Sequence, residues 1–525
     1  MSKRAKFLWA ASLLVLAGSL LVVYRWPQPT YQGKPLNWWV QQPMSLNELD
    51  SYLVTGEAMR HFGAAAVPEL LRRAKPTAWQ RLKQSLAARG WTVFASKSSV
   101  SASKWNRQMA LAEKLLALDA QAEPFAEELW PIFMDENSGA FARSVLPSLV
   151  TSNTTKQLVA RLKSSVPGDR THALVALICP NAHKVDPALL LGMLGDTNRT
   201  QDERILALRA LGASGLLPRE GIPAMTNLLS DTNSWVQYYA ALALAELGTR
   251  PEIPAAAVQA ALADGSTELS FGRARRVASC VMQAGAITRG PVQPKRLALC
   301  FTGHEFAEGA GVILDALSNR QARASFFLTG TFLGNTNFTP LTRRMFREGH
   351  YVGMHSDRHL LYCAWDPDRR TLVSRWEFRA DLIRNYQKVL QLHELPDNVW
   401  LPLPTGVYMI PPYEHYNRDI VNWAKELNVT LINYTPGTRS NADYTEDNAP
   451  NFVSSQAIFD SILARERSDP NGLNGFLLLL HLGAGPKRTD KFHTRFDELL
   501  TVLAAKGYQF VRVDELLASP PEPAG

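Results

Sequence analysis

The sequence is poor in cysteine and contains no long run of Lys and Arg. Its 525 residues include four cysteines, at positions 179, 280, 300 and 363, and no two of them form a CxxC pair, so their spacing gives no disulfide framework. Cys179 and Cys300 lie in apolar runs and are predicted to be small buried hydrophobes. The formal net charge of +8 is spread along the chain, and without a Lys/Arg run no nucleic acid partner is expected.

The composition is that of folded material rather than of a disordered chain. Hydrophobic residues make up 46% of the sequence and charged residues 20%. A chain of this length exceeds one ordinary hydrophobic core, so we expect a multidomain protein with two folded domains and an anchoring segment.

A long apolar run without a charged residue occurs near the N-terminus, from Phe7 to Tyr24. It is about long enough to span a bilayer. Three basic residues precede it and Arg25 follows it, so the positive-inside rule places the N-terminus in the cytoplasm. A cleaved signal peptide is the alternative, but no small-x-small cleavage site follows the run. We therefore expect residues 1–25 to be an uncleaved signal anchor of a single-pass cell-membrane protein, with the bulk of the chain on the periplasmic or extracytoplasmic side.

Helical periodicity follows the predicted anchor. Residues 26–49 are predicted to form a linker and a first helix, and residues 50–288 an all-α solenoid with apolar residues at intervals of three and four. The segment from Met193 to Asn198 recurs 35 residues later, from Leu228 to Asn233, and each copy precedes an Ala/Leu-rich helix. A period of this size resembles HEAT repeats, whose helix pairs bury their apolar faces by stacking on one another. Such a surface is suited to a protein partner.

The periodicity changes after a Gly- and Pro-bearing linker at residues 289–295. Arg296 to Thr302 is predicted to be a buried strand, Gly311 to Asn319 a helix, and Ala324 to Leu328 a second strand. Strands that alternate with helices indicate an α/β domain with a mainly parallel sheet. A short tail is expected at residues 518–525.

Residues 349–359 read Gly-His-Tyr-Val-Gly-Met-His-Ser-Asp-Arg-His and place two imidazoles four residues apart. At this spacing His355 and His359 can reach one metal ion from a single turn of chain. The segment resembles the second motif of the polysaccharide deacetylase (NodB homology) family, which carries both metal-binding histidines. The resemblance runs over residues 296–517. It implies the irregular (β/α) barrel of that family, a divalent metal and an acetylated polysaccharide as substrate.

The resemblance further implies that one carboxylate joins the two histidines at the metal and that a second carboxylate is the catalytic base. In the family both come from a Thr-Phe-Asp-Asp motif, whereas residues 299–305 of this chain contain no aspartate. The metal-binding Asp corresponds to Gly303 or His304, depending on a one-residue shift, and the base to Thr302 or Gly303. Among these residues His304 alone could bind a metal, and three neutral imidazoles with a water molecule form a sound zinc site. The predicted ligands of the metal, expected to be zinc, are His304, His355 and His359.

Further motifs supply catalytic candidates. Residues 410–414 stand where the family has Arg-Pro-Pro-Tyr-Gly, and the backbone amide of Tyr413 could retain the family's role of stabilising the oxyanion. The apolar strand that ends at His481 corresponds to the last motif, whose imidazole protonates the departing amine. Asp443, together with Arg439, is the closest counterpart of the acidic residue in the fourth motif.

With the aspartate pair missing, the role of catalytic base is open between two nearby carboxylates, Glu305 and Asp357. On this interpretation the protein is a metal-dependent hydrolase that removes N-acetyl or O-acetyl groups from an envelope or extracellular polysaccharide. The competing interpretation is a catalytically degenerate, membrane-tethered scaffold that binds glycan or protein without turnover. The retained histidines favour the enzyme, and the missing Asp, Asp and Arg favour the scaffold.

Overall fold

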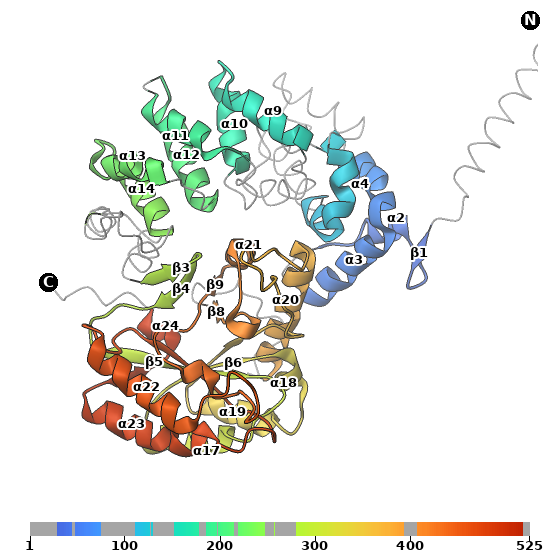
Figure 1. The fold of residues 1–525 in the computed structure, drawn as a ribbon. Coiled ribbons are helices and arrows are strands. Elements are labelled where there is room, and N and C mark those ends of the chain that lie inside the picture. Colours follow the sequence, from blue (N-terminus) through green and yellow to red (C-terminus); the bar gives the residue numbers. More distant parts are fainter. Residues whose placement is uncertain are drawn as a thin grey trace, which may run out of the picture. The chain divides into compact units, whose positions relative to one another are not determined.

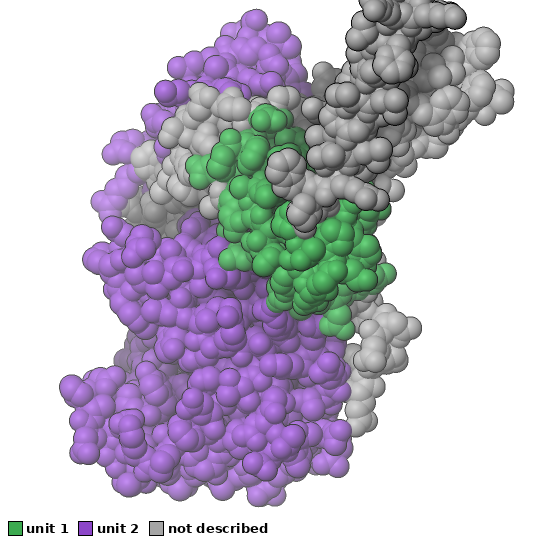
Figure 2. Space-filling model, turned by 90° about the vertical axis from the view of Figure 1, so that its right-hand side faces the viewer, with its two compact units in different colours: residues 1–149 green, residues 150–525 purple. Residues whose placement is uncertain are grey.

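The computed structural model describes residues 29–44, 48–74, 111–126, 128–129, 152–177, 185–196, 198–214, 219–246, 257, 280–392 and 407–517. The chain divides into two compact units, Met1–Leu149 and Val150–Gly525, which Figure 2 distinguishes by colour. No helix within the described ranges is long and apolar enough to cross a bilayer. The predicted anchor at residues 1–25 and the predicted tail at 518–525 lie outside those ranges.

The first unit contains a short hairpin followed by helices. β1 (Thr30–Tyr31) pairs antiparallel with β2 (Lys34–Pro35). The chain then forms α2 (Leu36–Trp39), α3 (Leu49–Phe62) and α4 (Ala66–Ala74). α3 buries Tyr52, Met59 and other apolar side chains on one face, as the three-and-four spacing of its sequence predicts.

The second unit begins with the helices that carry the repeated sequence. They are α9 (Ser152–Leu162), α10 (Pro167–Leu177), α11 (Pro187–Gly195), α12 (Gln201–Ser214), α13 (Ile222–Asn227) and α14 (Ser234–Glu246). Asp196 and Asp231 occupy the same place in the two copies, and each accepts a hydrogen bond from the backbone N–H two residues later, at 2.9 Å. The predicted helical region is thus present over its described residues, while its classification as a HEAT-like array stays a prediction.

The C-terminal domain is built on a seven-stranded parallel sheet (Figure 1). The strand order is β10-β5-β6-β7-β8-β9, and β11 pairs with the beginning of β5. The strands are β5 (Arg296–Gly303), β6 (Ser325–Leu328), β7 (Tyr351–Met354), β8 (Val407–Met409), β9 (Val429–Leu431), β10 (Leu477–His481) and β11 (Gln509–Val511). The two strands and the helix predicted between residues 296 and 328 are confirmed to within one residue at each end.

Helices follow the strands and cover the sheet. They are α17 (Ala310–Asn319), α18 (Gly330–Gly334), α19 (Thr339–Arg347), α20 (Arg375–Leu392), α21 (Arg418–Glu426), α22 (Ser455–Ser468), α23 (Phe496–Ala505) and α24 (Val513–Leu516). Alternate side chains of β5 point to opposite faces of the sheet and enter two different apolar clusters. Leu299 and Phe301 pack in the cluster shared with α17, α22 and α23. Ala298 and Cys300 face the other way, into the cluster that contains Phe327 of β6 and Leu479 of β10.

A hairpin that the helical prediction missed precedes this sheet. β3 (Val281–Gln283) pairs antiparallel with β4 (Ala286–Arg289), although residues up to 288 were predicted to be helical. Ala284 and Gly285 form the turn with φ of 47° and 88°, the left-handed pair typical of two-residue hairpins. The predicted boundary at residue 288 was therefore wrong, since the hairpin packs with the C-terminal domain.

The hairpin connects the two edge strands of the sheet, β9 and β10, by backbone pairing next to each of them. Ile287 forms a bridge to Ile432, just after β9, and Arg289 forms one to Phe476, just before β10. The backbone N–H of Gly290 also donates to the carbonyl of Gly475 at 2.7 Å. The hairpin thus satisfies backbone groups that an open sheet would leave unpaired, which explains why this short segment is extended rather than helical.

We expect the packing of the hairpin against the sheet to depend on Arg289. Its guanidinium donates to Asp469 at 2.8 Å and to the carbonyls of Gly472 and Asn474, and the ion pair is almost buried. Arg289→Ala removes the more buried of the two guanidinium partners of Asp469, which keeps its ion pair with Arg465 at 2.7 Å, so we expect the free energy of unfolding, measured by urea denaturation, to fall by about 1.5–3 kcal/mol.

The matched control is Arg320→Ala, which breaks a more exposed ion pair with Asp497 and should cost less than about 1 kcal/mol. Equal losses for the two variants would show that Arg289 does not hold the hairpin against the sheet.

Candidate active site

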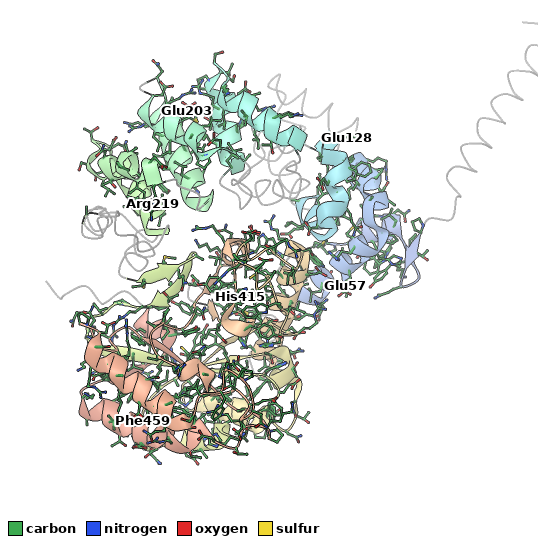
Figure 3. The ribbon with its side chains drawn as sticks, viewed as in Figure 1. Glu57, Glu128, Glu203, Arg219, His415 and Phe459 are labelled. Carbon is green, nitrogen blue, oxygen red and sulfur yellow. The ribbon has the colours of Figure 1, made fainter. Side chains whose placement is uncertain are left out.

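The candidate residues gather where the parallel strands end. His304 directly follows β5, His355 follows β7, and His481 is the last residue of β10. Tyr413 lies four residues beyond β8, next to His415, which is labelled in Figure 3. Because the carboxyl ends of parallel strands meet at one edge of a sheet, residues far apart in sequence come together here, as in other α/β folds.

The structure brings the three predicted ligand histidines into contact. The ring centroids of His304 and His359 are 4.4 Å apart and those of His355 and His359 are 5.1 Å apart. Tyr413 packs on the other side, 4.5 Å from His359. Among the described residues, no three His, Cys, Asp or Glu side chains already surround a common point in the arrangement of a metal site.

The chemistry of the histidine cluster nevertheless suits a cation. His355 donates its Nδ1–H to the carbonyl of Ile410 at 2.8 Å, which leaves Nε2 as the unprotonated nitrogen. Burial holds the pKa of His355 well below its usual value, and burial with the nearby His304 and His481 lowers the pKa of His359 to about 3. Burial also lowers the pKa of His304. Neutral imidazoles with free nitrogen lone pairs are the form that binds metals.

Two polar residues of α20 shape the loop that carries these histidines. Asp381 is fully buried and accepts hydrogen bonds from the hydroxyl of Ser356 at 2.6 Å and from the backbone N–H of Asp357 and Arg358 at 3.0 Å. Asn385, one turn further along the helix, accepts from the backbone N–H of His355 at 3.0 Å. The motif comparison missed both residues, although an Asp and an Asn one helical turn apart on the apolar face of a helix were the available signal.

His481 is paired with Asp443, the residue that the sequence analysis matched to the acidic residue of the fourth motif. Its Nδ1 lies 2.6 Å from Oδ1 of Asp443, whose second oxygen accepts from the backbone N–H of His481 at 2.9 Å. Burial by itself would lower the pKa of His481, but the carboxylate of Asp443 outweighs it and raises the pKa above its ordinary value. The carboxylate thereby favours the protonated imidazole and engages Nδ1, while Nε2 has no contact with Asp443.

The end of β5 is closely packed around Gly303. A Cβ atom at Gly303 would lie 2.9 Å from side-chain atoms of Leu328 and Phe332 and 3.0 Å from one of Leu482, so a side chain there would require these neighbours to shift. Thr302 sits beside His481 in the sheet register and is buried, and among the described residues its hydroxyl has no hydrogen-bond partner. If the base corresponds to Thr302 and the ligand to Gly303, the base position holds a short polar group and the ligand position holds no side chain. With the shift of one residue, His304 occupies the ligand position.

The two carboxylates proposed as a replacement base lie in different surroundings. Asp357 forms an ion pair with Lys388 at 2.7 Å and packs over Gly330 at the start of α18, so its charge is already neutralised and it is unsuited to that role. Glu305 is mostly exposed, with its carboxylate 3.9 Å from Nε2 of His304.

A third carboxylate, Glu414, was missed. It stands where the family's third motif has glycine, and it is held at a φ of 52°, which a residue with a side chain rarely adopts. Burial raises the pKa of Glu414 to about 7, with His481 and Asp443 as its charged neighbours. The signal in the sequence was the replacement of a glycine by an acidic residue in a motif at the end of a strand.

Comparison with known proteins supports the resemblance over part of the chain. The family model described as polysaccharide deacetylase matches residues 289–432. The peptidoglycan-N-acetylglucosamine deacetylase PgdA of Listeria monocytogenes is 26% identical over 228 residues, 42% of this chain and 39% of the relative. A chitin deacetylase of Pestalotiopsis sp is 27% identical over 254 residues, 45% of this chain and 73% of the relative. The chain thus aligns with well under half of the length of the Listeria protein.

Solved structures of the same kind are more distant. Bacillus subtilis PdaA, a family 4 carbohydrate esterase, is 21% identical, with 44% of this chain and 84% of that chain covered and a TM-score of 0.34. A CE4 family pseudoenzyme from Bacillus anthracis is 18% identical, with 45% and 70% covered and a TM-score of 0.34. The resemblance read from the histidine motif is confirmed by the polysaccharide deacetylase family model over residues 289–432.

Proposed function

We propose that the protein is a metal-dependent hydrolase that removes N-acetyl or O-acetyl groups from an envelope or extracellular polysaccharide. The observation that carries the proposal is the Asp443–His481 pair, which stands at the same sheet edge as the cluster of His304, His355 and His359. The named relatives that act on peptidoglycan and chitin support an acetylated glycan as the substrate.

The histidine cluster would hold the metal, expected to be zinc. His355 and His359 provide two neutral imidazoles, and His304 provides a third in place of the missing aspartate. When bound, such a cation polarises a carbonyl and lowers the pKa of water. Because no carboxylate belongs to this ligand set, the site keeps the full positive charge of the cation.

His481 is the general acid. The short hydrogen bond to Asp443 fixes its Nδ1 and favours the protonated ring, so Nε2–H is the proton available to a departing amine or alcohol. Tyr413 lies against His359 with its backbone in the left-handed region, and its N–H is the proposed donor to the oxyanion.

Glu414 is the preferred base. Its side chain is partly buried and has His481 and Asp443 as charged neighbours, in contrast to the exposed Glu305 and the paired Asp357. A carboxylate whose pKa lies near neutrality is a stronger base than one in water, and it can accept a proton from water at the pH of most cells.

The second candidate function is a glycan-binding or protein-binding scaffold without turnover. The close apolar packing around Gly303 supports it, because a carboxylate at this position would have to displace neighbouring side chains. Metal content and acetate release from a panel of acetylated glycans separate the two functions.

We further propose that residues 1–25 anchor the protein in the cell membrane, with the bulk of the chain on the extracytoplasmic side. The uncharged run from Phe7 to Tyr24 and the basic residues before it support this topology. The helical repeats would then offer a surface to a protein partner outside the cytoplasm.

The metal proposal predicts an ordered set of losses. We expect His359→Ala to abolish zinc binding and His304→Ala to weaken it, as measured by metal analysis of the purified protein. His481→Ala should retain the metal and lose activity by roughly 10²- to 10⁴-fold, the usual effect of removing a general acid. A wild-type protein that binds no divalent metal would leave the scaffold as the better function.

The hydrogen-bonded pair of His481 and Asp443 predicts how kcat depends on pH. Asp443 raises the pKa of His481, and a general acid is active only while protonated, so the rate falls as the pH rises through that pKa. Asp443→Asn should therefore move the alkaline limb of the kcat profile to lower pH. An unchanged limb with reduced kcat would mean that Asp443 acts on folding alone.

The choice of base is tested by two matched variants. We expect Glu414→Gln to lower kcat by about 10²-fold or more with the metal still bound, whereas Glu305→Gln, at the exposed carboxylate, should change it little. The reverse result, measured as acetate release, would assign the base to Glu305.

A further inference from the structure

Exposed aromatic rings border the candidate site. Among the described residues of the C-terminal domain, four aromatic side chains are strongly exposed, and each lies in a segment that follows a strand of the parallel sheet. These residues are Phe306 after β5, Trp365 after β7, Tyr413 after β8 and Tyr444 after β9. We call this set the aromatic rim. Exposed rings that gather at one edge of a domain mark a binding surface.

The rim is continuous with the candidate catalytic residues. Tyr444 packs 4.7 Å from His481, and Tyr413 packs 4.5 Å from His359. Trp365 extends the contacts outward, with its ring 6.3 Å from Tyr413 in an edge arrangement. A polymer whose acetyl group reaches the histidines would therefore meet Tyr413 and then Trp365.

Trp365 is the most exposed of the rim residues, at 65%, and yet it is firmly held. One face of its indole stacks on His415, with centroids 4.0 Å apart and planes 26° apart. His415 in turn donates its Nε2–H to the carbonyl of Ala364 at 2.8 Å. The other face of the indole is open to water, because a ring that is 65% exposed cannot be covered on both sides.

The loop that carries Trp365 is held to the domain by backbone pairing and hydrogen bonds. The backbones of Cys363 and Thr371 pair in an isolated antiparallel β-bridge across the base of the loop. The guanidinium of Arg369 donates to the carbonyl of Tyr416 at 3.0 Å. The amide of Asn417 donates to the carbonyl of Arg369 at 2.7 Å. A rigid ring loses little conformational entropy on binding, which is the property expected of a binding platform.

The chemistry around Trp365 favours a sugar over a lipid surface. Asp366, Asp368, Arg369 and Arg370 follow it directly, and burying such charges in a membrane is costly. The electronegative face of an indole attracts the polarised C–H groups on the flat face of a pyranose, while neighbouring polar groups serve its hydroxyls.

We propose that Trp365 is a sugar-stacking platform that binds a residue of the glycan chain beyond the one held at the histidine cluster, with Tyr413 between the two. This inference rests on the proposed polysaccharide substrate. It predicts that long oligomers depend on Trp365 and that a single acetylated sugar does not.

Binding is measured by calorimetry on the full chain, with a β-1,4-linked N-acetylglucosamine pentamer and the monomer as probes. The His481→Ala background prevents turnover during the titration. We expect Trp365→Ala to weaken binding of the pentamer roughly five- to tenfold, the range of an aromatic stacking contact, and to leave the monomer unchanged. Trp365→Phe should recover most of the affinity.

The control is Leu372→Ala, which removes another exposed side chain, 44% accessible, a few residues beyond the platform and outside the rim.

With His481 restored, Trp365→Ala should raise KM for the pentamer while kcat and hydrolysis of a small acetyl ester are unchanged. In the His481→Ala background, equal pentamer affinity with and without Trp365→Ala, or no pentamer binding when Trp365 is intact, overturns the platform. Binding that depends on Trp365 without acetate release overturns the deacetylase proposal instead.

Discussion

The buried carboxylate of Asp381 is the constraint on which the site depends. A carboxylate without solvent is unfavourable unless its oxygens are fully paired, and Asp381 meets this condition by ordering one loop, with the hydroxyl of Tyr362 as a further donor at 3.1 Å. The loop can bring these donors inward because Ser356 and His359 adopt φ of 71° and 54°. Such backbone conformations are unfavourable by themselves and persist where the surroundings determine them. The positions of His355 and His359 are thus set by a helix that contributes no ligand.

The site contains carboxylates although the end of β5 supplies none. The end of β5 lacks both aspartates and packs apolar side chains around Gly303. Glu414, after β8, stands where the family motif has glycine, and Asp443, after β9, corresponds to the acidic residue of the fourth motif. All these strands end at the same sheet edge, so a base supplied by a different strand can still serve the same reacting group, provided that it lies within reach.

The sequence predicted features that depend on local spacing and missed those that depend on distant contacts. The limits of β5, α17 and β6 follow from apolar runs a few residues long, and the histidine motif is contiguous. The β3–β4 hairpin is extended because it pairs with backbone groups after β9 and before β10. The pattern of apolar residues within the hairpin itself does not indicate these distant partners. The same holds for Asp381 and Glu414, whose meaning lies in what surrounds them once the strands are assembled.

The site also separates its histidines by environment. Burial lowers the pKa of His304, His355 and His359, whereas the hydrogen bond to Asp443 raises the pKa of His481. Groups of one residue type whose pKa values are pushed in opposite directions can take opposite roles: rings with lowered pKa values suit a cation, and a ring with a raised pKa suits proton donation. His481, the proposed acid, stands near the proposed metal ligands, so the positive charge of its protonated form would be unfavourable beside a cation without Asp443. Under the proposed function, Asp443 would therefore allow an acid and a cation to occupy the same sheet edge.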